Sequence, residues 1–334
     1  MKHIFLINPA AGNGKAGTAI LPEIISSVKN AGVSYDIHRT VNVGDATHYV
    51  REKCEEAPDE EKRFYACGGD GTVNEVLNGL IGEKRAQLAV IPVGTGNDFV
   101  RNFGDAKHFR DIRGQLDGSP VTVDALRYEF IEQTDETEAQ LAASEIRIFP
   151  RTGYAINMFN MGFDAEVVAK TAELKRNPLI SGPAAYISGV ASVLAKLRKL
   201  PLSIEVDGEM VGEGDYLLAG AANGRFSGGG FDGMPVALTN DGLMNVLAVK
   251  SVTRRFFISI VKKYHDGAHL DDERLAGVLA HYACAEAVFR AKRPMTFAVD
   301  GETTVTTAVR VSVVPAAVSF SVPRGIGEER SKGE

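Results

Sequence analysis

Three glycine-rich segments in the first hundred residues constrain the fold most, because each one directly follows a short apolar run. NPAAGNGKAG follows the run His3–Ile7, GGDGT follows Arg63–Cys67, and PVGTGND follows Gln87–Ile91. Another apolar run and three helix-like stretches complete this region: Ser34–Arg39, Thr18–Asn30, Ala46–Glu56 and Asn74–Ile81. Such alternation predicts a parallel sheet with helices on both faces. Ligands of these sheets bind at the carboxyl ends of the strands, where the three loops are predicted.

The pattern changes after Asp105. From about Val121 onward, short β-rich runs such as VTVDALRY, LSIEVDG and VRVSVVPAAVSFSV are separated by turn signals, which predicts a mainly antiparallel β-sandwich. Its predicted interruptions are a helical region at Asp164–Leu200 with a break at Pro178–Pro183, a helix at Thr253–Tyr264, and a solvated loop or short helix at Glu129–Ser144. We therefore predict an α/β domain over residues 1–120 and a β-rich domain over residues 121–308. The apolar run that follows allows residues 309–325 to return to the first domain.

Length and composition exclude several classes of protein. A chain of 334 residues exceeds one ordinary domain, and its 44% hydrophobic and 24% charged residues are typical of a globular protein. It contains no run of about 18 apolar residues and no signal-peptide pattern at its start. The net charge of −6 disfavours a broad nucleic-acid-binding surface, and three widely spaced cysteines favour a reduced compartment. We expect a cytoplasmic protein with no nucleic-acid partner.

The first glycine-rich loop has more than one interpretation. GNGKAG (Gly12–Gly17), with Asp36 in the next strand, formally matches a dinucleotide-binding fingerprint. However, Asn8-Pro9-Ala10-Ala11 lengthens a turn that should be tight, so a plain glycine-rich turn is an equal alternative. Phosphate binding without a nicotinamide also remains open, because the backbone amides of such a turn point at anions.

The second and third loops are more specific. YACGGDGTVNEVLNGL predicts a buried strand, a loop that contains Asp70, and a helix capped by Thr72. In the third loop Thr95 offers a hydroxyl and Asp98 lies at a helix start. Ordinary turns and an acid at a helix N-terminus are the alternatives. Two acids on neighbouring glycine-rich loops instead favour a magnesium–triphosphate site, because Mg²⁺ usually takes one or two carboxylates together with phosphates and water.

NPAAG, GGDGTVNEV and GTGNDFVR, in this order and spacing, resemble the catalytic domain of the diacylglycerol kinase and sphingosine kinase family, in particular its bacterial soluble lipid kinases. FNMGFDA (Phe159–Ala165), AANGRFSGGG, NDGL (Asn240–Leu243) and VDGE (Val299–Glu302) extend the resemblance to about residue 322. It implies a nucleotide-binding domain of the NAD kinase and diacylglycerol kinase type and ATP- and Mg²⁺-dependent phosphorylation of a membrane-lipid hydroxyl. Diacylglycerol is the expected acceptor and phosphatidic acid, used in phospholipid biosynthesis, the product. An NAD kinase and a non-catalytic, membrane-associated nucleotide-binding regulator remain the alternatives. The resemblance also implies peripheral membrane association and allows a homodimer.

The resemblance assigns roles to particular residues. Nucleotide contacts fall on the first three loops, the helix that follows GGDGT and one threonine: Asn8, Pro9, Ala10, Ala11, Gly12, Thr40, Gly68, Gly69, Asp70, Gly71, Thr72, Asn74, Glu75 and Thr95. Asp70 and Asp98 match the acids of the catalytic magnesium. A structural metal is implied at Asp241, with the backbone carbonyls of Leu238 and Leu243, although Asn245 stands where the family often has an acid. Asp300 is the implied general base, with Glu302 beside it.

Elementary chemistry supports a base at VDGE and leaves other features open. A lipid hydroxyl has a high pKa, so its attack on a phosphate benefits from a carboxylate that accepts the proton. Asp-Gly between β runs is also the ordinary sequence of a hairpin turn, which is how we interpret Asp207-Gly208. The basic residues Lys170, Lys175, Arg176, Lys196, Arg198 and Lys199 form either a solvated helical face or a membrane-docking patch. Lys15 could serve a surface or a phosphate.

Overall fold

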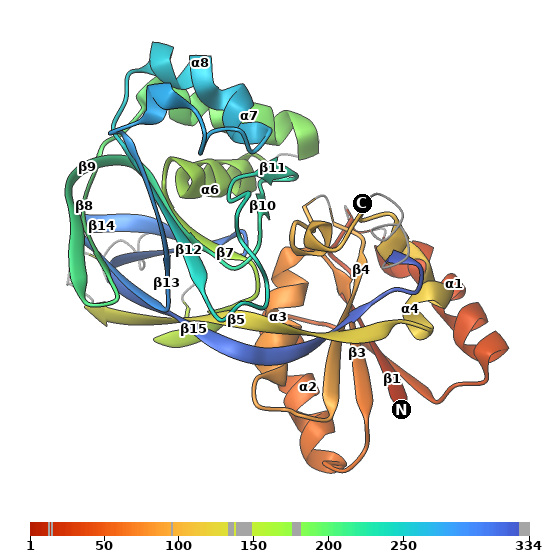
Figure 1. Ribbon diagram of the computed structural model, residues 1–334. Helices are drawn as coiled ribbons and strands as arrows, with labels where there is room; N and C mark the ends of the chain where they lie inside the picture. Colours follow the sequence, from red (N-terminus) through yellow and green to blue (C-terminus); the bar gives the residue numbers. More distant parts are fainter. Residues whose placement is uncertain are drawn as a thin grey trace. The chain divides into compact units, whose positions relative to one another are not determined.

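The computed structural model (Figure 1) describes residues 1–12, 14, 16–94, 96–132, 137, 149–175 and 182–326. The chain divides into two compact units. The first unit contains Met1–Ala125 and Pro315–Glu334, and the second contains Leu126–Val314. Two long strands run from one unit into the other: β5 (Ser119–Glu132) and β15 (Glu302–Val322).

The first unit contains a parallel sheet in the strand order β15-β4-β3-β1-β2. Its strands and helices in chain order are β1 (Lys2–Ile7), α1 (Ala16–Ala31), β2 (Tyr35–Arg39), α2 (Asp45–Glu56), β3 (Lys62–Gly68), α3 (Asp70–Leu80), β4 (Ala86–Pro92) and α4 (Ile112–Leu116). Short 3₁₀ helices cover Phe99–Asn102 and His108–Arg110. The α/β architecture predicted from the alternation of strand and helix is confirmed.

Both faces of this sheet are buried, as parallel sheets require. Phe5, Tyr65 and Ile91 pack with residues of α1 and α4, while alternate strand residues such as Leu6 and Phe64 are also fully buried. Helices α2 and α3 pack on each other. Because both faces are covered, ligands have access to this sheet at the strand ends, where the glycine-rich loops lie.

The second unit is mainly antiparallel. Its strands are β6 (Thr152–Ala155), β7 (Met158–Gly162), β8 (Leu200–Val206), β9 (Glu209–Ala222), β10 (Phe226–Ser227), β11 (Phe231–Asp232), β12 (Met244–Lys250), β13 (Leu279–Cys284) and β14 (Glu286–Val299). β8 pairs with both β9 and β14, so these long strands contribute to two layers around one apolar core. The predicted sandwich is thus confirmed.

Three helices, α6 (Phe163–Lys175), α7 (Gly182–Lys196) and α8 (Arg254–His265), pack over a second apolar cluster of this unit, and a 3₁₀ turn covers Glu273–Leu275. The predicted break between α6 and α7 falls largely on residues 176–181, outside the described residues. The prediction of a loop or short helix at Glu129–Ser144 is wrong for Glu129–Glu132. These residues are the last four of β5, and Glu129 pairs with β6. No helix in the described part of the chain is both long enough and apolar enough to cross a lipid bilayer.

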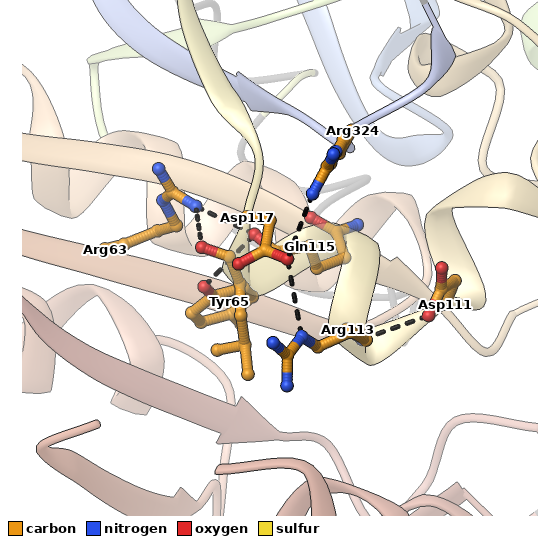
Figure 2. A network of polar contacts seen from close by, with 8 residues as sticks. Arg63, Tyr65, Asp111, Arg113, Gln115, Asp117 and Arg324 are labelled. Atoms are coloured by element: carbon orange, nitrogen blue, oxygen red, sulfur yellow. Dashed lines mark hydrogen bonds and ion pairs between the residues drawn. The ribbon is translucent and has the colours of Figure 1, made fainter. Parts of the chain in front are cut away.

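A buried arginine fixes the amino end of the first sheet to α4. Arg63, only 3% exposed, donates from Nη1 to the carbonyls of Gln115 (2.7 Å) and Leu116 (3.2 Å), and from Nη2 to that of Gly118 (2.9 Å). These carbonyls lie at or just after the C-terminus of α4, where helical acceptors lack intrahelical partners and a positive charge is favourable. Figure 2 shows Arg63 beside Gln115 and Asp117.

The C-terminal segment joins the same network. The backbone N–H of Arg324 donates to the carbonyl of Gly114 at 3.0 Å, and its guanidinium approaches Asp117 at 4.0 Å (Figure 2). Exposed Arg113 pairs with the same carboxylate at 3.3 Å. The network therefore joins β3, α4 and the returning C-terminus within one unit.

We predict that Arg63→Ala lowers the free energy of unfolding by about 3–5 kcal/mol, because several buried carbonyls lose their donor. Arg113→Ala is the matched control, since its ion pair is exposed, and it should cost less than about 1 kcal/mol. Urea unfolding of both variants measures the difference. Equal effects would contradict the assignment of Arg63 as the structural member of the network.

Candidate functional site

Asn8 connects the first glycine-rich loop to the second. Its backbone N–H donates to the carbonyl of Cys67 at 3.1 Å, and its Nδ2 donates to Thr72 Oγ1 at 3.0 Å. Its Oδ1 accepts from the backbone N–H of Ala10 at 3.0 Å, which closes a local turn. Pro9, Ala10 and Gly12 are left exposed. Their backbone is therefore available to a ligand at the end of β1.

The helix after GGDGT starts earlier than predicted. α3 begins at Asp70 with Gly69 as the N-cap residue, so the prediction that Thr72 caps the helix is wrong. Thr72 is buried in the first turn because Gly68 has no side chain: a Cβ on Gly68 would lie 2.2 Å from Thr72 Oγ1. The start of α3 is a helix N-terminus, the kind of element that can bind phosphate.

Asp70 holds the third loop against the second. Its Oδ2 accepts from the backbone N–H of Asn97 at 2.9 Å, and its Oδ1 accepts from that of Asp98 at 3.1 Å. Burial raises the pKa of Asp70, and these N–H groups and the charge of Arg101 oppose the rise. Asp98 is 8% exposed and lies 3.5 Å from Arg101 Nε. The structure thus brings together the two acids that the sequence predicts.

Glycines make this close approach of the loops feasible. A Cβ on Gly94 would lie 2.8 Å from the Cα of Gly69, and one on Gly96 would lie 2.3 Å from Asp70 Oδ2 and 4.0 Å from Asp98 Oδ2. Both carboxylates therefore border the same stretch of bare backbone. Thr95, between these glycines, lies outside the described residues.

Asn97 is a member of this site that the sequence analysis did not assign. It adopts a left-handed backbone conformation (φ 57°), and its Nδ2 donates to the carbonyl of Gly94 at 2.8 Å. Its Oδ1 is buried without a hydrogen-bond partner among the described residues. The signal was present in Gly-Asn-Asp, because asparagine is one of the few residues that tolerate this conformation.

The remaining predicted nucleotide contacts of the first unit lie at or near the same strand ends. Thr40 follows β2, and its N–H donates to the carbonyl of Ile7 at 3.0 Å. Gly71, Asn74 and Glu75 lie in the first turns of α3. Asp36, by contrast, is the second residue of β2 and pairs with Lys2 at 2.6 Å. This position does not support the ribose-binding acid of a dinucleotide fingerprint, and Lys15 lies outside the described residues.

Asp300, in the second unit, occupies a hairpin turn and anchors a neighbouring loop. Asp300 and Gly301 both have positive φ (45° and 86°), as a two-residue turn between β14 and β15 requires. The buried carboxylate accepts backbone N–H groups of Ile156 on Oδ2 (2.9 Å) and of Asn157 (3.0 Å) and Met158 (3.1 Å) on Oδ1. The hairpin interpretation is confirmed, and the role of Asp300 as a general base stays a prediction.

The second Asp-Gly turn provides an internal comparison. Asp207 and Gly208 have nearly the same φ angles, 48° and 86°, and connect β8 to β9. Asp207 accepts the N–H groups of Ala285 and Glu286, but it is exposed, whereas Asp300 is 7% exposed. Asp207-Gly208 thus forms the ordinary turn that we predicted. Glu302, half-buried, begins β15 beside the Asp300 turn.

Two asparagines complete the loop that Asp300 holds, and the sequence analysis assigned neither. Asn223 donates from Nδ2 to the carbonyl of Ile156 at 2.8 Å and from its backbone to that of Asn157 at 2.8 Å. Asn157 Nδ2 donates to the carbonyl of Phe226 at 2.8 Å. Asn223 lies in AANGRFSGGG, so the motif was visible, although the partner of this asparagine was not.

The turn that is predicted to bind a structural metal is stabilised by a hydrogen bond between two of its own residues. Asp241 is exposed and its Oδ1 accepts the N–H of Leu243 at 3.0 Å, while Leu238 and Leu243 are also exposed. Asn245 is buried and its Oδ1 lies 2.8 Å from Nε2 of His281. Within the described ranges, no three histidine, cysteine or acidic side chains gather as a metal site. A metal at Asp241 therefore stays a prediction.

Two family models match the chain. The model for the diacylglycerol kinase catalytic domain covers residues 2–128, and that for the YegS C-terminal NAD kinase beta sandwich-like domain covers residues 157–322. The chain is also 30% identical over 274 residues to a diacylglycerol kinase of Bacillus subtilis, a match covering 81% of this chain and 80% of the relative. The chain belongs to the diacylglycerol kinase family of lipid kinases. It is therefore an enzyme, a phosphotransferase, and membership of this family implies use of ATP.

Other relatives cover nearly the whole of this lipid kinase. A Stenotrophomonas maltophilia protein named "Probable lipid kinase YegS-like" is 29% identical over 325 residues, 94% of this chain and 95% of the relative. A crystal structure of a diacylglycerol kinase from Bacillus anthracis has a TM-score of 0.65 at 20% identity, covering 97% of this chain and 98% of the other. This last likeness supports the fold of the lipid kinase.

We predict that Gly69→Ala weakens ATP binding and leaves the stability of the fold nearly unchanged. Its added Cβ would meet only the Cα of Gly94, at 3.8 Å, and its φ of −101° suits alanine. The variant should unfold within about 1 kcal/mol of the wild type. Its ATP affinity, measured by calorimetry, should fall about tenfold or more because the methyl group obstructs the approach of phosphate to the loop.

Gly94→Ala is the matched control. Its Cβ would clash with the backbone of Gly69, so this variant should lose stability as well, by about 1–3 kcal/mol. Unchanged ATP affinity in a folded Gly69→Ala protein would contradict a phosphate site at this loop.

Proposed function

We propose that this lipid kinase transfers the γ-phosphate of ATP to the hydroxyl of diacylglycerol and produces phosphatidic acid. The observation that carries the nucleotide half of this proposal is the pair of hydrogen bonds from Asn97 and Asp98 to Asp70, which holds two glycine-rich loops together. The hydrogen bond from Asn8 to Thr72 joins the first glycine-rich loop to these two. Backbone N–H groups of three loops and the N-terminus of α3 can then neutralise phosphate charge.

The donor atoms of these loops fit a magnesium ion. Mg²⁺ prefers hard oxygen ligands, and these loops offer the carboxylates of Asp98 and Asp70 and the buried Oδ1 of Asn97. Mg²⁺ commonly binds through one or two carboxylates and the phosphates of the substrate, so a larger cluster of acids is not required. Bound there, the ion would supply charge neutralisation for the triphosphate. We therefore propose Asp98 and Asp70 as its protein ligands.

Asp300 is proposed as the general base. The three backbone N–H bonds fix the orientation of its carboxylate, which as a general base would accept the proton. In the proposed reaction the lipid hydroxyl gives its proton to Asp300 as its oxygen bonds to the γ-phosphorus. The bond between that phosphorus and the bridging oxygen breaks, and ADP leaves with the electron pair.

Radiolabelled ATP with a panel of acceptors tests the proposed function. The panel contains diacylglycerol, sphingosine, ceramide, undecaprenol and phosphatidylglycerol in mixed micelles, with NAD as a soluble acceptor. We expect the largest kcat/KM for diacylglycerol and a requirement for Mg²⁺ that chelation removes. Preferential phosphorylation of NAD, or ATP binding without transfer to any lipid, would contradict the proposal.

We predict that Asp300→Asn lowers kcat by about two to four orders of magnitude, the usual range for a general base. The amide nitrogen would also face backbone N–H groups, so stability should fall by about 1–3 kcal/mol. Asp207→Asn is the matched control, because it changes the same residue in the same kind of turn away from the proposed chemistry. It should leave kcat unchanged. Wild-type turnover of Asp300→Asn on diacylglycerol would remove Asp300 from the mechanism.

We further propose that the helical face at the ends of α7 and α8 docks on an anionic bilayer. Arg254 donates to the carbonyl of Ala195, which joins the start of α8 to the end of α7. Lys196, Arg198 and Arg255 are exposed and form no ion pair with any described residue, whereas Lys199 pairs with Asp215. On α8, Ile258 is 59% exposed and lies three positions after Arg255 and four after Arg254, on the same side of the helix. Cations beside exposed apolar groups suit a membrane surface.

Charge reversal tests this docking. We predict that changing Lys196, Arg198 and Lys199 to glutamate lowers binding to phosphatidylglycerol vesicles by about two orders of magnitude, since each basic residue contributes about 1 kcal/mol. Activity on a short-chain, water-soluble diacylglycerol should persist. Reversal of the exposed Lys29, Lys84 and Lys107 in the first unit is the matched control and should leave vesicle binding near the wild-type value.

Asp98→Ala distinguishes docking from chemistry. It should damage activity in both assays equally, because the phosphates lose their metal in either setting. Equal loss in both assays after the reversal at Lys196, Arg198 and Lys199 would assign those residues to catalysis or structure. No loss in either would leave them a solvated helical face.

A further inference from the structure

The second unit contains an apolar pocket of about 530 Å³. Its walls come largely from three helices: Val167 and Val168 of α6, Tyr186 and Val190 of α7, and Phe257 and Val261 of α8. An apolar lining of this kind binds hydrocarbon, because both surfaces leave water when they meet.

The Asp300 turn and a second pocket that neighbours the first lie in the same unit. A smaller pocket of about 270 Å³ shares Asn160 and Tyr264 with it and is also lined by Met158. The backbone N–H of Met158 is one of the three donors to Asp300. Met158 therefore borders both the smaller pocket and the Asp300 turn.

Asn160, Tyr186 and Ser227 add polar groups to this wall, and Asp164 and Tyr264 form a hydrogen-bonded pair in it. Tyr264 Oη donates to Asp164 Oδ2 at 2.8 Å, and the Tyr264 ring packs edge-on against His269 with 4.8 Å between ring centroids. Asp164 also lines the pocket, and its second oxygen, Oδ1, makes no hydrogen bond to any residue in the described part of the chain. Asp164 is the one carboxyl group among the residues that line the pocket.

The surroundings of Asp164 favour its neutral form. Burial raises the pKa of Asp164 to about 6, although the hydrogen bond from Tyr264 opposes the rise. The other titratable side chains that line the pocket are Tyr186 on α7 and Tyr264 on α8; those from β7 and from residues 227–231 carry no titratable group. A hydrocarbon chain in the pocket would displace water and raise the pKa of Asp164 further. Since Oδ2 accepts from Tyr264, the proton would lie on Oδ1, where a neutral carboxyl can donate.

We propose that this pocket holds an acyl chain of the lipid acceptor and that Asp164 donates a hydrogen bond from Oδ1 to the ester carbonyl of that chain. The inference rests on the proposed lipid kinase function and narrows its substrate to ester-linked lipids. Asp164 is then a specificity residue, which distinguishes an acyl ester from an alkyl ether of the same length.

A pair of lipids that differ only in this group provides the test. Dioctanoylglycerol has ester carbonyls and dioctylglycerol has ether oxygens in their place. We expect the wild type to prefer the ester about tenfold in kcat/KM, the factor of one buried hydrogen bond. Asp164→Leu should reduce this preference to about one. Asp164→Asn should keep it, because its amide can accept from Tyr264 and donate to the carbonyl.

Val168→Ala is the matched control in the same wall. It should weaken both lipids by the same factor, because it removes apolar contact and no hydrogen bond. If Asp164→Leu does not fold, the Asp164→Asn and Val168→Ala variants and the proton measurement below still test the inference.

Calorimetry in buffers of different ionisation heat measures the proton directly. At pH 7 the wild type should take up about one proton when it binds dioctanoylglycerol, and Asp164→Asn should take up none. Without lipid, the raised folded-state pKa lowers wild-type stability as pH rises from about 4 to 6. Asp164→Asn should therefore unfold at a higher temperature than the wild type at pH 7, and this difference should disappear below about pH 4.

The outcomes separate this inference from the proposed function. Phosphorylation of both lipids with equal kcat/KM by wild type and Asp164→Leu, or no proton uptake, would overturn the role of Asp164 alone. A preference for a long-chain amino alcohol that Asp164→Asn abolishes would also overturn it, since an ionised carboxylate would then be binding an ammonium group. Failure of the wild type to phosphorylate any lipid would instead overturn the proposed function.

Discussion

The proposed nucleotide site of this protein depends on one carboxylate that joins two loops. Asp70 follows β3 and accepts the backbone N–H groups of Asn97 and Asp98, which follow β4. Enclosure of this charge is unfavourable by itself, and the N–H groups compensate for it. The bare backbone of Gly94 and Gly96 is required because a side chain at either position would collide with the second loop. The positions of the amides proposed to bind phosphate and of Asp98 follow from this arrangement.

The second unit also contains a carboxylate that accepts hydrogen bonds from the backbone N–H groups of a loop. Asp300 fixes Ile156–Met158, and Asn223 holds the same loop from another strand. Asp207 shows that an Asp-Gly turn alone does not create such a site, since its backbone is alike but its carboxylate is exposed. Burial and the number of backbone donors distinguish the two turns. Asp164 differs from both, because its donor is a tyrosine hydroxyl and its second oxygen lines an apolar pocket.

Much of the fold and part of the site could be predicted because their causes are local. Apolar runs of five to seven residues between helix-like stretches determine β1 to β4, and the glycine-rich loops at their ends follow from the direction of a parallel sheet. The predictions were wrong where a residue distant in the sequence determines the local structure. Glu129–Glu132 begin an acidic stretch that resembles a loop, but they extend a strand that pairs with β6. Thr72 resembles a helix cap, but its hydroxyl accepts from Asn8 inside the first turn.

The sequence by itself determined the class of this protein, since the ordered motifs around Asn8, Asp70 and Asp98 and the alternation of strand and helix require no knowledge of packing. Tertiary structure alone decided the partners of these residues. Asn8 meets Thr72 across 64 positions, Asp300 meets Ile156 across 144, and Asp164 meets Tyr264 across 100. The physical reason is that hydrophobic period and turn chemistry act between neighbours in the chain, whereas a buried hydrogen bond is selected only when packing brings two distant groups together and removes water from both.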